Sequence, residues 1–167
     1  SDRFIQLAAE NAPAGATFER LDARHMGFDI EFDAVICLCQ GAFGLMTAGG
    51  DDRAVLAGMA RALRVGGRLA LTAFSSYYVV KHWADADFDA GSGINHERTE
   101  IRNETGDAVG ADLWTGCYTP RELRLLCEAT GLAVDSVCSV EPGGYANAPP
   151  TVDSPEFLLL ASRRGGG

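Results

Sequence analysis

The chain has 167 residues, a net charge of −9 and a pI of about 4.7, and 47% of its residues are hydrophobic. This length suits one domain that buries roughly 70% of its unfolded surface, and the composition is that of an ordinary soluble globular protein. Lys and Arg together number 14, and they form no basic stripe of the kind that binds nucleic acid phosphates. The acidic charge therefore disfavours nucleic acid and anionic membranes as partners and favours a small molecule.

The five cysteines are odd in number and scattered along the chain. They include no C-x-x-C pair of the kind that binds zinc, so we expect no metal site. Reduced, structural thiols fit an intracellular protein, and we expect a cytoplasmic location. No apolar run reaches the ~18 residues of a membrane span, and the sequence shows no signal peptide. The chain opens without Met, inside a predicted helix, which favours a fragment of a longer protein.

The amino-terminal residues predict a helix followed by a strand. Ser1 suits an N-cap, and residues 11–15, which include proline and glycine, end the helix. Residues 16–21 (ATFERL) then predict a strand that places Asp22 at its carboxyl end.

Residues 32–74 predict a βαβ unit. A short apolar run (residues 32–38), a glycine-punctuated loop, a stretch of helical periodicity (residues 51–63) and a second apolar run (residues 68–74) follow one another. Weak alternation in both runs predicts parallel strands buried on both faces, with a right-handed crossover. A ligand is then expected beyond the carboxyl end of the first strand, around residues 38–43.

Residues 75–117 interrupt this pattern, and we interpret them as an insertion over the site. They end in a predicted β-hairpin, whose strands span residues 96–103 and 108–117 around a turn. We assign residues 1–162 to a single α/β domain and residues 163–167 to a disordered tail.

The segment TPRE after the hairpin gives the strongest local signal in the sequence. Thr119 suits the N-cap, the proline the first helical position and Glu122 the capping box, which together stabilise a helix by about 1–2 kcal/mol. That helix ends at Gly131. Residues 132–140 and 156–161 predict two more strands, separated by a loop rich in glycine and proline.

Five segments, each present once, follow one another in a characteristic order along the chain. They are LDA, FDAVICL followed by CQGAFG, ARALRVGGRLAL, YTPRELRLLCEATGL and the final FLLLASRR. This ordered set, which covers nearly the whole chain, resembles the class I S-adenosylmethionine-dependent methyltransferases. The resemblance implies an α/β fold: a Rossmann-like, mostly parallel sheet with flanking helices, missing its N-terminal strands and ending in an antiparallel strand. It also implies S-adenosyl-L-methionine as the cofactor and methyl transfer to a small-molecule acceptor.

The resemblance further implies six cofactor contacts. In the family an acidic residue after the third strand lies at the adenine, and the end of the fourth strand lines the methionine part and the transferable methyl. These positions correspond here to Asp22 and Ala23, to Leu38, Cys39 and Gln40, and to the nearby Phe43. The residues themselves leave other roles open: Asp22 as a loop cap, Gln40 as a partner of loop backbone groups, and Phe43 as a core residue.

Two features of the family have no counterpart in this sequence: the glycine-rich loop and the acidic residue that holds the ribose hydroxyls. Loss of a carboxylate that accepts two charge-assisted hydrogen bonds costs roughly 3–6 kcal/mol, which is on the order of a hundredfold to ten-thousandfold in affinity. We therefore expect the chain alone to bind the cofactor poorly, and we interpret it as a methyltransferase without its amino-terminal third. The missing segment, or a homo-oligomer, is the expected partner.

Methyl transfer from a sulfonium is an in-line displacement that needs aligned reactants, no metal ion and, for some acceptors, a base. His82 and His96 are the candidate bases, although a lone histidine is more typical of a surface or a cap. Five aromatic residues are candidates for the acceptor pocket, although packing of the insertion on the sheet explains them equally well: Tyr77, Tyr78, Trp83, Trp114 and Tyr118.

Two other functions compete with this interpretation. A non-catalytic Rossmann-like partner domain of a split or degenerate methyltransferase would keep the βαβ scaffold and dock another chain at its truncated edge. A nicotinamide-linked oxidoreductase is disfavoured, because the sequence has no G-x-G-x-x-G motif.

Overall fold

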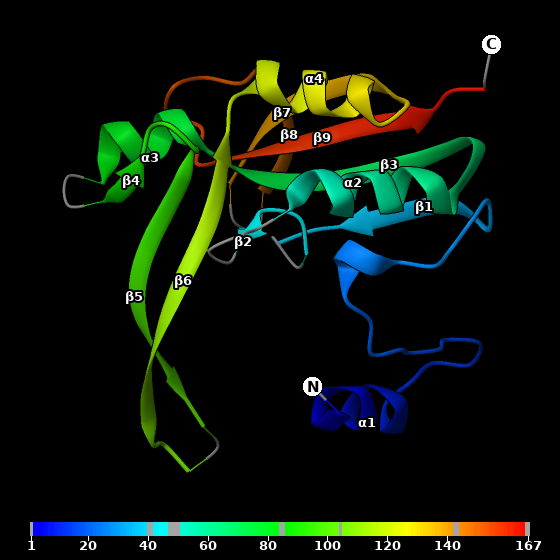
Figure 1. The fold of residues 1–167 in the computed structure, drawn as a ribbon, viewed down its shortest axis with the longest axis horizontal. Helices are drawn as coiled ribbons and strands as arrows, with labels where there is room; N and C mark the ends of the chain where they lie inside the picture. Colours follow the sequence, from blue (N-terminus) through cyan, green and yellow to red (C-terminus); the bar gives the residue numbers. More distant parts are fainter. Residues whose placement is uncertain are drawn as a thin grey trace.

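The computed structural model describes residues 2–39, 42–46, 51–83, 86–103, 105–141 and 144–165. Their strands form a nine-stranded sheet in the order β4-β5-β6-β3-β9-β7-β8, with β1 paired to β3 and β2 paired to β6 (Figure 1). The strands are β1 (Phe32–Cys37), β2 (Leu45–Met46), β3 (Leu63–Ser75), β4 (Asp87–Asp89), β5 (Ile94–Arg102), β6 (Ala108–Tyr118), β7 (Leu132–Glu141), β8 (Gly144–Ala148) and β9 (Glu156–Arg163). The helices are α1 (Asp2–Glu10), the short 3₁₀ helix η1 (Ala23–His25), α2 (Asp52–Ala62), α3 (Ser76–His82) and α4 (Pro120–Ala129).

The predicted βαβ unit is confirmed. Strands β1 and β3 pair in parallel, from Ala34 opposite Arg68 to Cys37 opposite Leu71, and α2 connects them. The side chain of Asp51 caps α2 by accepting a hydrogen bond of 2.8 Å from the amide of Ala54.

The α/β, Rossmann-like fold is also confirmed, but the sheet is not mostly parallel. Among the strands that the structure describes, β1 with β3 and β3 with β6 run in parallel, whereas the other pairs are antiparallel. The difference arises because tight turns connect β4 to β5 and β5 to β6, and a short connection between successive strands makes them antiparallel. The last strand, β9, is antiparallel to β3 as expected.

The core lies on one face of the sheet. Alternate residues of β3 and β9, such as Leu71 and Phe157, are completely buried there. They pack against Val55 and Met59 of α2 and against Leu123 of α4, all within one apolar cluster. The hairpin β5–β6 extends away from this body (Figure 1).

The opposite face of β1 is uncovered, contrary to the expectation that both faces are buried. Val35 and Cys37 point toward α2 and join the core, whereas Ile36, between them, is 74% exposed. Successive side chains of a strand point to opposite faces. The single helix α2 therefore covers only one of them, and no other described element covers the second.

The amino-terminal helix is confirmed as α1, but the strand predicted for residues 16–21 is not formed. No residue of α1 is buried, and residues 11–22 contain no regular element. Figure 1 shows α1 at the end of this irregular segment, apart from the sheet. A strand needs a neighbour for its backbone hydrogen bonds, and in the described chain β1 pairs only with β3.

The carboxyl-terminal elements are close to those predicted. Thr119 and Glu122 form the expected capping box at the start of α4. Strand β8 lies inside the predicted loop between β7 and β9. Strand β9 continues to Arg163, and the amide of Arg164 donates to the carbonyl of Gly131, so the ordered chain extends into the predicted tail.

The structure describes all five cysteines and forms no disulfide between them, and four of them are buried. Burial raises the pKa of Cys117 and of Cys127 to about 11, so both stay protonated at neutral pH and act as small core residues. Only Cys39 is exposed. No helix in the described part of the chain is long and apolar enough to cross a membrane.

Candidate functional site

The chain leaves the sheet at the carboxyl end of β1, where the sequence predicts the ligand. Leu38 is 37% exposed, and Cys39 adopts a positive φ of 55°, which turns the backbone away from the strand. The amide of Cys39 donates a hydrogen bond of 2.8 Å to the hydroxyl of Thr72, which is buried on β3. This bond fixes the point at which the chain departs from the sheet.

Phe43, predicted near the cofactor, lies in the core instead. It is completely buried and stacks on Tyr118, with ring centroids 4.9 Å apart. The hydroxyl of Tyr118 donates a hydrogen bond of 2.8 Å to Asp52 in the first turn of α2. Burial raises the pKa of Tyr118, which keeps it a neutral hydrogen-bond donor. Phe43 therefore anchors the segment after β1 in the core, and its side chain has no exposed surface for contact with a ligand.

Asp22 caps the 3₁₀ helix η1, one of the roles that the sequence left open. One carboxylate oxygen accepts from the amide and from Nε of Arg24, at 3.0 and 2.9 Å, and the other accepts from Nη2 at 2.6 Å. These hydrogen bonds from Arg24 hold the pKa of Asp22 well below its usual range. Ala23 packs against the core beside α2. Arg24 also interacts electrostatically with Asp51, the residue that caps α2.

Contact of Asp22 and Ala23 with an adenine stays a prediction. Gln40, the remaining predicted cofactor contact, lies outside the described residues.

The candidate base His82 is tied to a loop between β8 and β9. Its Nε2 lies 2.7 Å from a carboxylate oxygen of Asp153, which also accepts a hydrogen bond of 2.6 Å from Lys81. Its ring packs on Tyr78, with centroids 4.5 Å apart. The contact with Asp153 therefore connects the end of α3 to this loop.

The candidate base His96 is held between two carboxylates. Its Nδ1 lies 3.1 Å from Asp87 and its Nε2 lies 2.8 Å from Asp112, and its ring stacks on Trp114 at 4.8 Å. Hydrogen bonds to Asp87 and Asp112 raise the pKa of His96 above its ordinary 6.5. A general base needs a free nitrogen lone pair, and both nitrogens are engaged in this geometry. The role of either histidine as a base stays a prediction, and the contacts of His96 favour a charged imidazolium.

The structure does not gather the five predicted aromatic residues into one pocket. Trp83 lines a cavity of about 560 Å³ against β5, and Tyr77 lines another of about 550 Å³ between α3 and the start of α4. Tyr78 instead packs on His82 with its ring tilted, Trp114 stacks on His96, and Tyr118 belongs to the core.

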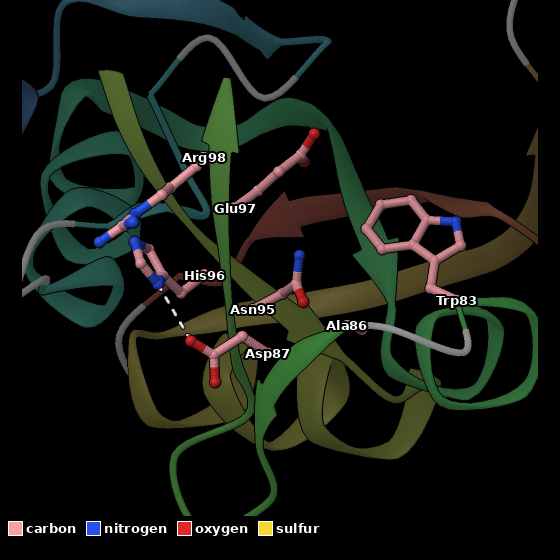
Figure 2. Close-up of a pocket in the computed structure, with 7 residues that line it drawn as sticks. All are labelled: Trp83, Ala86, Asp87, Asn95, His96, Glu97 and Arg98. Atoms are coloured by element: carbon pink, nitrogen blue, oxygen red, sulfur yellow. Dashed lines mark hydrogen bonds and ion pairs between the residues drawn. The ribbon is translucent and has the colours of Figure 1, made fainter. Parts of the chain in front are cut away.

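Figure 2 shows the first cavity, which includes a residue that the sequence did not single out. Asn95 is buried on β5 beside His96 and faces the cavity. The predicted hairpin strand began one residue after Asn95, so no pattern in the sequence indicated that this polar side chain is buried.

Neither a family model nor a curated protein matches the chain. Its architecture combines a central sheet containing the parallel pair β1 and β3, α2 and α4 on one face, and the β5–β6 hairpin before α4, and as a whole it is similar to that of solved structures. The fold is that of the S-adenosylmethionine-dependent methyltransferases.

Three of these structures show how far the similarity extends. CcbJ methyltransferase from Streptomyces caelestis superimposes with a TM-score of 0.71 at 13% identity, over 98% of this chain and 70% of that chain. An S-adenosylmethionine-dependent methyltransferase from Clostridium acetobutylicum gives 0.68 at 11% identity, over 96% and 69%. CalS10, an amino pentose methyltransferase from Micromonospora echinaspora, gives 0.58 at 18% identity, over 98% and 71%. At these identities the methyltransferase likeness is one of fold.

Proposed function

We propose that the protein takes part in methyl transfer from S-adenosyl-L-methionine to a small-molecule acceptor. The observation that carries the proposal is the exit of the chain at Leu38 and Cys39, at the carboxyl edge of a parallel strand pair within a methyltransferase fold. Ligands of open α/β sheets bind at such edges. CalS10, with the same fold, is described as an amino pentose methyltransferase, which supports a small acceptor here.

The residues at this edge suit the methionine end of the cofactor. Leu38 offers a partly exposed apolar side chain, and the thiol of Cys39 is exposed beside it. Asp22 and Ala23 are the residues we assign to the adenine end, and Asp22 would have to share its carboxylate with Arg24 there. When bound, S-adenosyl-L-methionine supplies a methyl group on a positively charged sulfur. The acceptor attacks the methyl carbon in line and the sulfur leaves, without a metal ion.

The chain itself contributes positioning. The hydroxyl of Thr72 accepts a hydrogen bond from the amide of Cys39, at the end of β1. The hydrogen bond from Tyr118 to Asp52 connects β6 to the start of α2, beyond the loop that follows β1. Both contacts restrain the end of β1 and the chain that follows it. The segment between β3 and α4 forms a cavity beside β5, lined by Trp83, Asn95 and Glu97 among others. A reaction that depends on alignment requires such fixed geometry, because misplacement by about 1 Å can lower a rate about a hundredfold.

Titration of the full chain with S-adenosylhomocysteine, followed by ¹⁵N NMR and calorimetry, tests the proposal. We expect weak binding with chemical-shift changes concentrated at Leu38 and Cys39. In a second titration, with S-adenosylmethionine, Leu38→Arg should weaken binding by about tenfold or more, equivalent to ~1.4 kcal/mol, because it places a positive charge near the sulfonium that S-adenosylhomocysteine lacks. Ile101→Arg, at an exposed position far along β5, is the matched control and should leave the affinity unchanged.

The non-catalytic partner domain predicts the opposite outcome. Absence of shift changes at millimolar ligand, or equal affinities of the Leu38→Arg and Ile101→Arg variants, would refute the methyltransferase proposal.

A further inference from the structure

Asn95 carries a buried hydrogen-bond acceptor that nothing in the described chain satisfies. The residue is 3% exposed, and its Oδ1 has no partner among the residues that the structure describes. Buried polar atoms are normally hydrogen-bonded, since an unpaired one has lost its water without replacement. Asn95 lines the cavity of about 560 Å³ beside β5, together with Glu97 and Trp83 (Figure 2). The unpaired oxygen is therefore carried by a residue that lines a cavity of this volume.

The pairing of the strands places Asn95 near the edge proposed for methyl transfer. Asn95 lies opposite Thr115 on β6, and Thr115 lies opposite Leu45 on β2. Residues opposite one another in neighbouring strands project from the same face of a sheet. Adjacent strands are about 4.8 Å apart, so Asn95 lies roughly 10 Å from the backbone of Leu45. Leu45 belongs to the segment that follows β1 in the chain, so Asn95 lies two strands away from that segment.

The charges around the cavity are paired with one exception. His96 contacts Asp87 and Asp112, and Nε of Arg98 lies 3.5 Å from the same carboxylate oxygen of Asp112. Glu97, which also lines the cavity, forms no ion pair within the described part of the chain. One negative charge of the cavity wall is thus left without a partner.

Three features of the cavity favour the same kind of ligand. The oxygen of Asn95 needs a donor, the carboxylate of Glu97 favours a positive charge, and the indole of Trp83 offers an aromatic face to a cation. A protonated amine supplies both N–H donors and charge. A hydroxyl would satisfy Asn95 but would leave Glu97 unpaired.

We propose that this cavity binds an ammonium group of the acceptor substrate, with Asn95 Oδ1 accepting an N–H bond, Glu97 balancing the charge and Trp83 packing over the group. The assignment of the ligand as the acceptor rests on the proposed methyl transfer. A protonated amine has no lone pair, so this group serves recognition, and the methylated atom lies elsewhere on the acceptor.

Two probes of the same ring size test the inference by NMR titration of the full chain: cyclohexylammonium and cyclohexanol. We expect cyclohexylammonium to shift the side-chain signals of Asn95 and Trp83 and to bind about tenfold more tightly than cyclohexanol. Glu97→Gln should remove that preference. Glu100→Gln is the matched control, because Glu100 lies on the same strand and is paired with Arg102 at 3.0 Å, and it should keep the preference. Equal binding of the two probes, or an unchanged preference in Glu97→Gln, overturns the proposal.

Asn95→Leu separates ligand recognition from a structural role. If the oxygen is unpaired in the free protein, the variant keeps or raises the melting temperature while the binding of cyclohexylammonium is lost. A lowered melting temperature would show that the oxygen is satisfied within the fold, and retained binding would show that it does not contact the amine; either result overturns the assignment.

The S-adenosylhomocysteine titration is read at Leu38 and Cys39. Amine binding without cofactor binding therefore refutes the methyl-transfer proposal and leaves the ammonium site intact.

Discussion

The hydroxyl of Tyr118 on β6 donates a hydrogen bond of 2.8 Å to the carboxylate of Asp52, 66 residues earlier in the sequence. Asp52 opens α2, and Phe43 stacks on the ring of the same tyrosine. This contact ties together the loop after β1, the helix that follows it and the strand that ends the insertion. The edge proposed for ligand binding is therefore held by a tyrosine that is buried in the core.

Removal of this hydroxyl should destabilise the protein without changing the fold. We expect Tyr118→Phe to lower the free energy of unfolding by about 1.5–3 kcal/mol, the range for a hydrogen bond to a charged group. Urea denaturation followed by circular dichroism measures the change. Tyr77→Phe is the control, because Tyr77 is exposed at a cavity mouth, and it should stay within about 0.5 kcal/mol of the unmodified protein. Equal effects of both substitutions would contradict the structural role of Tyr118.

Two glycines of β6 give a matched pair for the packing around Tyr118. A Cβ atom at Gly116 would lie 2.5 Å from the Tyr118 hydroxyl and 2.9 Å from Cε of Met46, whereas a Cβ at Gly110 would meet nothing within 4 Å. The hydroxyl cannot move without losing Asp52, so we expect Gly116→Ala to cost about 1–3 kcal/mol. Gly110→Ala should be neutral or slightly stabilising, because alanine loses less conformational entropy on folding. Thermal denaturation of the two variants distinguishes these outcomes, and a stable Gly116→Ala protein would mean that Tyr118 is not fixed.

The histidine held between carboxylates should show a pH-dependent contribution to stability. The pKa of His96 is raised above 6.5 in the folded state by its hydrogen bonds to Asp87 and Asp112. The proton is therefore bound more tightly in the folded state than in the unfolded state. The stabilisation is fully present below pH 6.5 and is lost as the pH rises through the higher pKa of the folded protein.

NMR titration of the His96 ring protons measures this pKa directly. Asp112→Asn should lower it toward the ordinary value, because it removes one of the two carboxylates. Asp33→Asn, which breaks the remote pair with Arg64, should not change it. A His96 pKa at or below 6.5 in the unmodified protein would show that the two contacts are not formed in solution.

The capping box at the start of α4 should respond to the two halves of the motif differently. Thr119 accepts a hydrogen bond of 3.1 Å from the amide of Glu122, and the Glu122 side chain accepts one of 3.1 Å from the amide of Thr119. Thr119→Ala should lower the free energy of unfolding by about 1 kcal/mol. Glu122→Gln keeps an acceptor at the same place and should be nearly neutral, since glutamine also completes a capping box. Chemical denaturation measures both, and a neutral Thr119→Ala variant would show that the cap does not contribute to stability.

Local signals in the sequence predicted most of the elements correctly. These elements depend on residues that are close to one another in the chain: the cap at Thr119, the periodicity of α2 and the turn between β5 and β6. A local sequence pattern is therefore enough to predict them. The prediction of a strand over residues 16–21 was wrong for the converse reason. Its apolar and β-branched residues suit a strand, but a strand forms only when another chain segment supplies hydrogen bonds, and that depends on distant residues.

The sequence predicted where the chain leaves the sheet, but not the burial and the contacts of the residues around that point. The sequence alone determined that the chain leaves a parallel strand near Leu38 and Cys39, because a buried run, a glycine-rich loop and a helix in succession permit few other arrangements. Only the tertiary structure decided that Phe43 turns into the core and that Asn95 keeps a buried oxygen without a partner. It also decided that His96 lies between Asp87 and Asp112. Burial and hydrogen-bond partners arise between residues distant in sequence, and no spacing along the chain specifies them.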